Sequence, residues 1–243
     1  MADRLEAPPR ARLSRDRVLA AAVSLADEIG LDALSMRRLA DELDVVPMAL
    51  YKHVADKEDL LDGMVEVLVR EIELSPAGLD WRTGARRRVL SARRELLRHP
   101  WGRQAIESRK RKTPAVLEYM DSLIGLFLAE GFSPDLTHHV MHAIGGRMWG
   151  FTQEVFEEPP AASTSGRTAT PTPISAAEFE QLTQHFPNIA MMAAVAQHDD
   201  GTVVARGCDD QFEFEFALDL MLDGIERLHR NGWTPADAEL TRR

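Results

Sequence analysis

The feature that most constrains the fold of this chain is a helix-start signal that recurs four times between residues 14 and 72. Serine or aspartate stands where a helix N-terminus needs a capping side chain, and Pro47 suits the first position of a helix. Apolar residues at helical spacing follow these signals. The pattern predicts helices over residues 14–30, 35–43 and 57–73, and a short one that begins at Pro47.

The segment that begins at Pro47 has one apolar side and one polar side. Leu50 and Val54 lie four residues apart and can anchor one face, while Tyr51, Lys52 and His53 point outward. A tight turn at residues 44–45 joins this helix to the one before it. Such an arrangement is a helix-turn-helix unit. Its last helix is either an ordinary surface helix or one that contacts a partner.

The rest of the chain is also helical in pattern, and no convincing strand appears. The stretch "FEFEF" alternates like a strand, but five residues are too few to decide between the two periods. Residues 157–173, "EEPPAASTSGRTATPTP", are predicted to be a mobile linker because they hold nothing that packs a core. The further predicted helices span residues 81–98, 100–108, 113–130, 134–156, 175–197 and 211–231. The sequence therefore predicts an all-α fold.

The formal net charge of −10 argues against a nucleic-acid partner until its distribution is considered. Residues 81–112 hold 12 basic and 2 acidic side chains, whereas the chain after them is strongly acidic. Binding follows local charge, so the global value excludes little. We interpret the basic block as a solvated helical face rather than a phosphate-binding patch. Its central members are Arg86, Arg87, Arg88, Arg93 and Arg94.

Several classes of protein are excluded or disfavoured. A single cysteine, Cys208, excludes an intrachain disulfide framework and suits a reducing cytoplasm. No stretch approaches the ~20 apolar residues that span a bilayer, and the N-terminus has no apolar run typical of a signal peptide. No nucleophile elbow, phosphate loop or cofactor fingerprint appears, so we expect neither an enzyme nor a cofactor.

Two late helices carry matching apolar seams at spacings of three and four residues. These seams pack either as internal core or as a four-helix interface across a two-fold axis. The first seam, in residues 134–156, consists of Met141, Ile144, Met148, Phe151 and Val155. The second, in residues 211–231, consists of Phe214, Leu218, Met221, Ile225 and Leu228.

A mixed stripe lies beside the first seam. His138 and His142 share a helix face, but the zinc-protease glutamate and a third ligand are missing, so we expect no metal there. Trp149 and Thr152 continue the same stripe. Imidazole, indole and hydroxyl groups together suit a pocket for an amphipathic small molecule, and a half-buried helix face explains them equally well.

The stretch from residue 13 to 69, with its core "LSMRRLADEL…ALYKHV…K..LL", resembles the DNA-binding region of the TetR (tetracycline-repressor) family of bacterial transcription regulators. "LLRHPW" and "FEFALDLMLDGIERL" resemble, more weakly, the ligand-binding and dimerisation domain of that family. The resemblance implies a helix-turn-helix DNA-binding domain over residues 13–60 and a connecting helix over 57–73. A larger helical ligand-binding and dimerisation domain would follow over residues 74–243.

The resemblance also implies roles for single residues. The helix from Pro47 would enter the major groove, where Met48 and Ala49 contact bases and Lys52 reaches guanine acceptors. Lys57 would bind phosphate at a helix N-terminus. The full implied DNA-binding set is Ser35, Arg37, Pro47, Met48, Ala49, Tyr51, Lys52, His53 and Lys57.

Two residues depart from the family pattern, which usually has Gly at Asp44 and a small or capping residue at Val46. Asp tolerates the left-handed conformation, so the turn should survive, whereas Val is a poor cap. The resemblance alone adds Trp101 and Met120 to the pocket candidates.

The sequence thus predicts a homodimeric repressor that a small organic effector releases from a palindromic DNA operator. A helical small-molecule-binding enzyme and an activator remain the alternatives.

Overall fold

The structure is a computed structural model that describes residues 12–76, 78–156, 180, 183–188, 190–191 and 210–236, with the side chains of 149–156 left out. The chain divides into two compact units, one of Met1–Thr152 with Asn231–Arg243 and the other of Gln153–Arg230. All its regular elements in the described ranges are helices, which confirms the all-α class. None of these helices combines the length and the apolarity that crossing a membrane requires.

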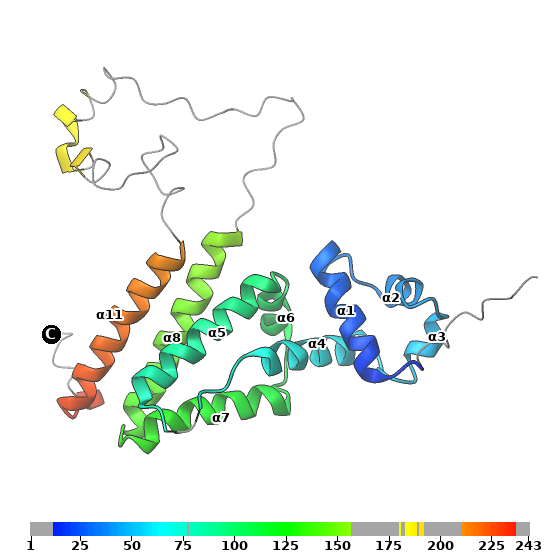
Figure 1. Cartoon of the computed structure of the whole chain (residues 1–243), viewed down its shortest axis with the longest axis horizontal. Helices are drawn as coiled ribbons and strands as arrows, with labels where there is room; N and C mark the ends of the chain where they lie inside the picture. The colour runs from blue at the N-terminus through cyan, green and yellow to red at the C-terminus, as the bar shows by residue number, and fades with distance from the viewer. Residues whose placement is uncertain are drawn as a thin grey trace, which may run out of the picture. The chain divides into compact units, whose positions relative to one another are not determined.

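The first three helices form the predicted helix-turn-helix (Figure 1). Helices α1 (Arg15–Ile29) and α2 (Met36–Glu42) begin at the predicted serine caps, whose side-chain oxygens accept hydrogen bonds from backbone N–H groups. Helix α1 ends at Gly30, whose positive φ of 77° is a conformation that glycine adopts without strain. Helix α3 (Pro47–Leu50) begins at the predicted proline.

The turn before α3 and the end of α3 follow from local geometry. Asp44 has a φ of 53°, so an aspartate occupies the left-handed position at which the resemblance expects glycine. Val46 caps α3 without a side-chain hydrogen bond. Beyond Leu50 the chain continues in turns, and the backbone N–H of Val54 still donates to the carbonyl of Leu50 at 3.0 Å. One helical turn and its extension therefore carry the outward side chains.

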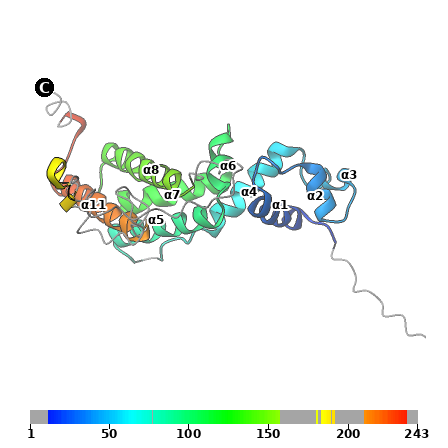
Figure 2. The same cartoon turned by 90° about the horizontal axis from the view of Figure 1, so that it is seen from above.

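Helix α4 (Lys57–Glu71) begins at the cap Asp56 and packs closely on α1. A Cβ added at Gly63 would lie 2.5 Å from Leu19 Cδ2, so the two helices approach at a point where only glycine fits without a shift. The same helix contacts α5, α6 and α7. It is therefore a main link between the helix-turn-helix and the rest of its unit, as Figure 2 shows from above.

Four further helices complete this unit: α5 (Trp81–Arg98), α6 (Gly102–Ser108), α7 (Pro114–Ala129) and α8 (Pro134–Phe156), of which the last residues belong to the second unit. Their core includes a cluster of three rings, with Trp81 and Phe127 centroids 5.7 Å apart and Phe132 edge-on to both. These helices lie within two residues of their predicted bounds, because each has a clear apolar face and stop signal.

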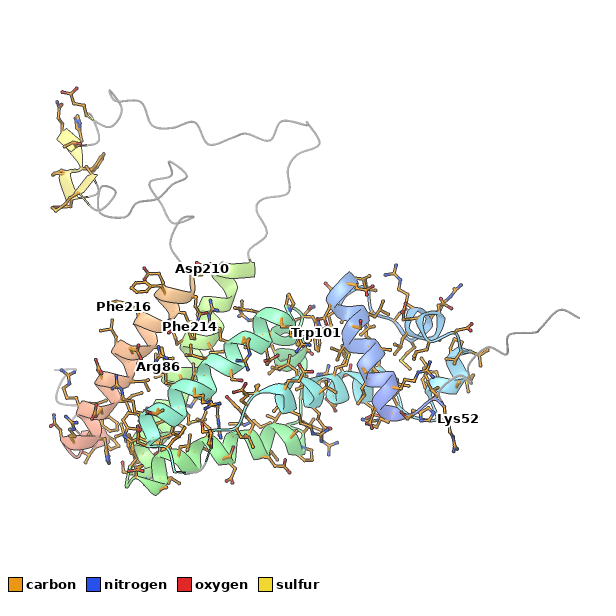
Figure 3. The ribbon with its side chains drawn as sticks, in the orientation of Figure 1. Lys52, Arg86, Trp101, Asp210, Phe214 and Phe216 are labelled. Atoms are coloured by element: carbon orange, nitrogen blue, oxygen red, sulfur yellow. The ribbon has the colours of Figure 1, made fainter. Side chains whose placement is uncertain are left out.

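Helix α11 (Asp210–Arg230) belongs to the second unit and agrees with the prediction for 211–231. The "FEFEF" stretch is part of it, so its alternation places phenylalanines on different sides of a helix (Figure 3). Phe214 is buried, whereas Phe216 is 54% exposed.

One interpretation of the basic block is wrong in part. Arg88 and Arg93 are only 3% and 4% exposed, so the block is not simply a solvated face. The α5 helix buries them because its polar positions also fall on the side that packs against the unit. Their outward neighbours Arg87 and Arg94 both pair with Glu73.

Three predictions fall outside the part of the chain that the structure describes. They are the linker over 157–173, most of the helix over 175–197, and the thiol of Cys208. The division into units does not test the predicted domain bounds, which stay predictions.

Candidate nucleic-acid interface and effector cavity

The short helix α3 exposes large side chains over a buried base. Leu50 and Val54 are 0% and 1% exposed, which confirms the predicted anchors, whereas Met48 is 71% and Tyr51 44% exposed. A methionine that faces solvent to this extent gains nothing from the core. Lys52 is also exposed and extends away from the helices in Figure 3. This surface therefore has the character of a contact surface.

The other candidate DNA-binding residues surround α3 with different exposure. Arg37, Pro47 and Lys57 are exposed, while Ala49 and His53 are half-buried. The hydroxyl of Ser35 accepts a hydrogen bond from the Arg38 backbone N–H at 3.2 Å, so it caps α2. The DNA contacts of all these residues stay predictions.

An ion pair that the sequence did not reveal supports the end of α3. Arg15 Nη2 donates to Asp59 Oδ1 at 2.7 Å, and Arg15 Nη1 donates to the backbone carbonyl of His53 at 2.9 Å. Asp59 Oδ2 also accepts from the Ala55 backbone N–H at 2.8 Å. The hydrogen bond from Arg15 is the main reason that the pKa of Asp59 is lowered. Helices α1 and α4 thus fix the backbone that follows the recognition residues.

A second polar cluster joins α1 to the segment between α5 and α6. Asp27 Oδ1 accepts from the Trp101 indole N–H at 2.6 Å and lies 2.8 Å from His99 Nδ1. His99 and Trp101 are 3% and 4% exposed. Figure 3 places Trp101 where α1 approaches this segment. The contact accounts for the burial of Trp101, and its predicted role in ligand binding stays a prediction.

One cluster in the described residues has the composition of a metal site. Ligand atoms of Glu71, Glu95 and His99 lie within 4.8 Å of one another. However, Arg98 Nη1 lies 3.5 Å from a carboxylate oxygen of each glutamate, and Arg94 Nε donates to Glu95 at 3.0 Å. The chain's own cations therefore neutralise these carboxylates, and the cluster ties α4 to α5.

An apolar cavity lies among α4, α5, α6, α7 and α8, with a volume of about 440 Å³. Its polar groups come mainly from the α6–α7 loop, together with the phenol of Tyr119, whose pKa is raised by burial. Such a cavity suits an apolar molecule with a few polar groups. Its lining includes Val65, Leu68, Leu96, Ile106, Arg109, Arg111, Lys112, Thr113, Tyr119, Met120, Leu123, Met141, Ile144 and Met148.

A neighbouring cavity of about 460 Å³ brings together three of the predicted pocket residues. Met120, His138 and His142 line it, and Met120 also lines the first cavity. The rings of His138 and His142 have centroids 4.6 Å apart. The side chains of Trp149 and Thr152 lie outside the described residues. Their ligand-binding roles, and those of the two histidines, stay predictions.

Most of the described residues predicted for a dimer interface are buried or half-buried within the single chain, and their role in dimerisation stays a prediction. On α8, Ile144 and Met148 are buried and, with half-buried Met141, line the first cavity. On α11, Phe214, Leu218 and Ile225 are buried, and Met221 and Leu228 are half-buried. Phe151 and Val155 lie among the undescribed side chains. The exposed apolar residues of α11 are instead Phe212, Phe216 and Leu220, at 62%, 54% and 57%.

Two family models match the chain. The model for bacterial regulatory proteins of the tetR family matches residues 18–64. The model for the tetracyclin repressor-like C-terminal domain matches residues 75–229. The first match covers the helix-turn-helix, and the second covers the cavity and α11.

Two curated relatives match over most of their length. The HTH-type transcriptional repressor DrrR1 of Streptomyces coeruleorubidus is 31% identical over 229 residues, which cover 90% of this chain and 80% of the relative. The tetracycline repressor protein class G of Vibrio anguillarum is 30% identical over 220 residues, or 89% of this chain and 95% of the relative.

Solved structures share the fold. One from Streptomyces coelicolor A3(2), described as a possible TetR family transcriptional regulator, has a TM-score of 0.64 and 29% identity, covering 88% of this chain and all of the other. A TetR variant from Acinetobacter baumannii AYE in complex with minocycline has a TM-score of 0.60 and 26% identity, covering 90% of this chain and 99% of the other.

Proposed function

The chain belongs to the TetR family of bacterial transcription regulators, and on this premise we propose that it is a homodimeric repressor released from its operator by a small organic molecule. The family membership confirms the resemblance seen in the sequence and makes the chain a ligand-responsive DNA-binding regulator. One observation carries the proposal: α4 contacts both the helix-turn-helix and the helices around the cavity. An occupant of the cavity can therefore act on the helix-turn-helix through one helix, α4, which packs on α1.

The exposed side chains of α3 would read the operator. Met48 and Ala49 are placed for apolar contact with bases, and Lys52 is long enough to reach guanine acceptors in the major groove. Tyr51 and His53 would contact phosphates or base edges. Arg37 and Lys57 would bind phosphates on either side, and the capping bond of Ser35 leaves its hydroxyl one further hydrogen bond to a phosphate.

We place the dimer contact on the exposed face of α11 formed by Phe212, Phe216 and Leu220. These side chains are spaced four residues apart and are more than half exposed, so a second copy of the chain would cover them. A two-fold axis implies a palindromic operator with half-sites about 34–36 Å apart. The variant Phe216→Glu with Leu220→Glu should sediment as a monomer, and a dimer of this variant would exclude this face.

The cavity of about 440 Å³ would hold the effector. The related A. baumannii protein was solved with minocycline, a small organic molecule, which supports a ligand of this size class. Coupling between effector and operator is reciprocal, so operator DNA should weaken effector binding by the same factor. Because bacterial operator DNA lies in the cytoplasm, we propose that the protein acts there.

The test of the proposed function uses DNA fragments selected from random sequence by the purified protein. Lys57→Ala should weaken binding to all fragments alike and lower the slope of log affinity against log salt by about 1. Lys52→Ala should instead change which fragments are preferred. Failure to select any fragment would refute the regulator, and identical behaviour of the two variants would refute the division of roles.

The alternatives predict different products. An enzyme that used the cavity would convert a bound molecule, whereas the proposed regulator returns it unchanged. Chromatography of any bound molecule before and after incubation separates these cases. A promoter carrying the selected fragment should be silenced by the repressor and stimulated by an activator.

A further inference from the structure

The α6–α7 loop gathers positive charge at one end of the apolar cavity. Arg109, Arg111 and Lys112 line the cavity, and its described lining includes no carboxylate. The remaining walls are mostly aliphatic and methionine side chains. An uncharged apolar molecule would make no ion pair with the three cations. An apolar molecule with an anionic group would contact both the apolar walls and the cationic end of the cavity.

The next residue of the loop offers a hydrogen-bond donor without a partner. The hydroxyl oxygen of Thr113 is buried, lines the cavity and makes no hydrogen bond to any described residue. Buried hydroxyls are normally paired, so an unpaired one that lines a cavity indicates a ligand acceptor. Thr113 and the cationic side chains before it therefore define one polar end of the cavity.

Arg109 also holds the first turns of α4. Its side chain is 8% exposed, and its Nη1 donates to the Glu58 carbonyl and to Asp62 Oδ1, each at 3.2 Å. The carboxylate of Glu58 lies 3.1 Å from the same nitrogen. An arginine that pairs with α4 and lines the cavity is shared between the two, because any anion in the cavity competes for it.

The turn that Arg109 holds is continuous with the support of α3. Asp59 follows Glu58 directly, accepts from the Ala55 backbone N–H and binds Arg15. Arg15 in turn binds the carbonyl of His53. A shift of the first turn of α4 therefore reaches the backbone that follows the recognition residues through two successive hydrogen bonds, from Asp59 to Arg15 and from Arg15 to the carbonyl of His53.

We propose that the effector is an apolar molecule with an acidic group, and that this group takes Arg109 away from Glu58 and Asp62. This inference rests on the proposed function and names both its ligand class and its relay. The acid group binds Arg109 and the Thr113 hydroxyl, with Arg111 and Lys112 nearby. The first turn of α4 loses its anchor, and the supports of α3 at Asp59 and Arg15 move with it.

Two fluorescent probes that differ by one anionic group test the ligand class. Anilinonaphthalene sulfonate carries the anion, and its uncharged parent anilinonaphthalene has the same rings. Arg109→Gln should weaken binding of the sulfonate about tenfold and that of the parent less than about twofold. Lys110→Gln removes the same charge from an exposed neighbour that does not line the cavity, and should change neither affinity. Equal losses for both probes, or no loss, would overturn the proposal.

A variant of the opposite sign tests the competition. Asp62→Asn removes one of the two carboxylate partners of Arg109 and should strengthen sulfonate binding by about two- to fivefold. Glu107→Gln is the matched control, since Glu107 pairs with Arg103 on the surface of α6. If Asp62→Asn leaves the sulfonate affinity unchanged or lowers it, Arg109 is not shared and the relay is wrong.

DNA binding with and without the probe distinguishes the proposed regulator from the proposed relay. The sulfonate should lower the affinity for selected DNA at least about threefold in wild type and not in Arg109→Gln. Wild-type DNA binding that is intact but insensitive to the bound sulfonate would refute the relay alone. Absence of DNA binding without any probe would refute the proposed function, while the probe titrations would still decide the ligand class.

Discussion

The surface around α3 takes its exposed side chains from one short run of sequence, Pro47 to Lys57, whereas the cavity takes its lining from five helices, α4 to α8. In α3 and the turns that follow it, Leu50 and Val54 are buried, whereas Met48, Tyr51 and Lys52 are exposed. Around the cavity, most of the lining residues are apolar and many of them are buried, yet they face a space that no side chain fills. In α3, the buried residues stabilise the fold and the exposed residues are available to contact a partner. Around the cavity, the same residues both form the core and border the space that a ligand would occupy.

The largest effect should come from breaking the separation at α3. Leu50 is 0% exposed, so Leu50→Ala should lower the free energy of unfolding by about 2–5 kcal/mol. Met48, two residues earlier, is 71% exposed, and Met48→Ala should lower it by less than about 0.5 kcal/mol while weakening DNA binding. Chemical denaturation of both variants makes the comparison. Similar losses of stability in the two variants would show that Met48 contributes to the fold as much as Leu50 does.

A smaller loss should follow from breaking the contact between α1 and the segment that joins α5 to α6. Asp27→Ala leaves the buried donors of His99 and Trp101 without their shared acceptor, so the free energy of unfolding should fall by about 1–3 kcal/mol. Asp32→Ala is the control, because Asp32 accepts only an exposed hydrogen bond from Gln104. If both variants unfold alike, the Asp27 cluster does not hold α1 in place.

Truncating a residue that lines the cavity should lower the free energy of unfolding by less than truncating the buried Leu50 of α3. Met120 lines both cavities and is half-buried, so Met120→Ala should cost about 1 kcal/mol or less, because the removed atoms had few neighbours. The same variant should weaken binding of the apolar parent probe. A loss as large as that of Leu50→Ala would mean that Met120 is packed on all sides.

The smallest expected effect is on the stability of the fold at acidic pH. Because Arg15 lowers the pKa of Asp59 below its usual value of 3.8, this pair contributes stability that is present above that value and is lost as the pH falls through the folded pKa. Asp59→Asn should therefore unfold with a weaker dependence on pH in this acidic range. Solvent screens the pair, since Asp59 is 34% exposed, so the difference should be small. Identical acid unfolding curves would show that the pair stabilises nothing.

The helices and the α3 surface were predictable because their signals are local. Ser14 caps the helix that starts beside it, and the four-residue spacing of Leu50 and Val54 is visible in a few letters of sequence. The support of α3 was not predictable, because Arg15 and Asp59 are 44 residues apart. The burial of Arg88 was missed for a related reason: a charged residue predicts solvent unless its partners, here Ser122 and the ring of Tyr119, are known.

The sequence by itself determined the order and ends of the described helices, the family, and which side of α3 faces outward. Each depends on residues within a few turns of one another, because helical periodicity and capping act over that distance. Only the tertiary structure decided that Arg109 faces both α4 and the cavity, that Trp101 binds Asp27, and that Met141 and Met148 line a cavity. A cavity is the space that packed helices leave between them, so its walls are set by contacts between distant residues and not by any local pattern.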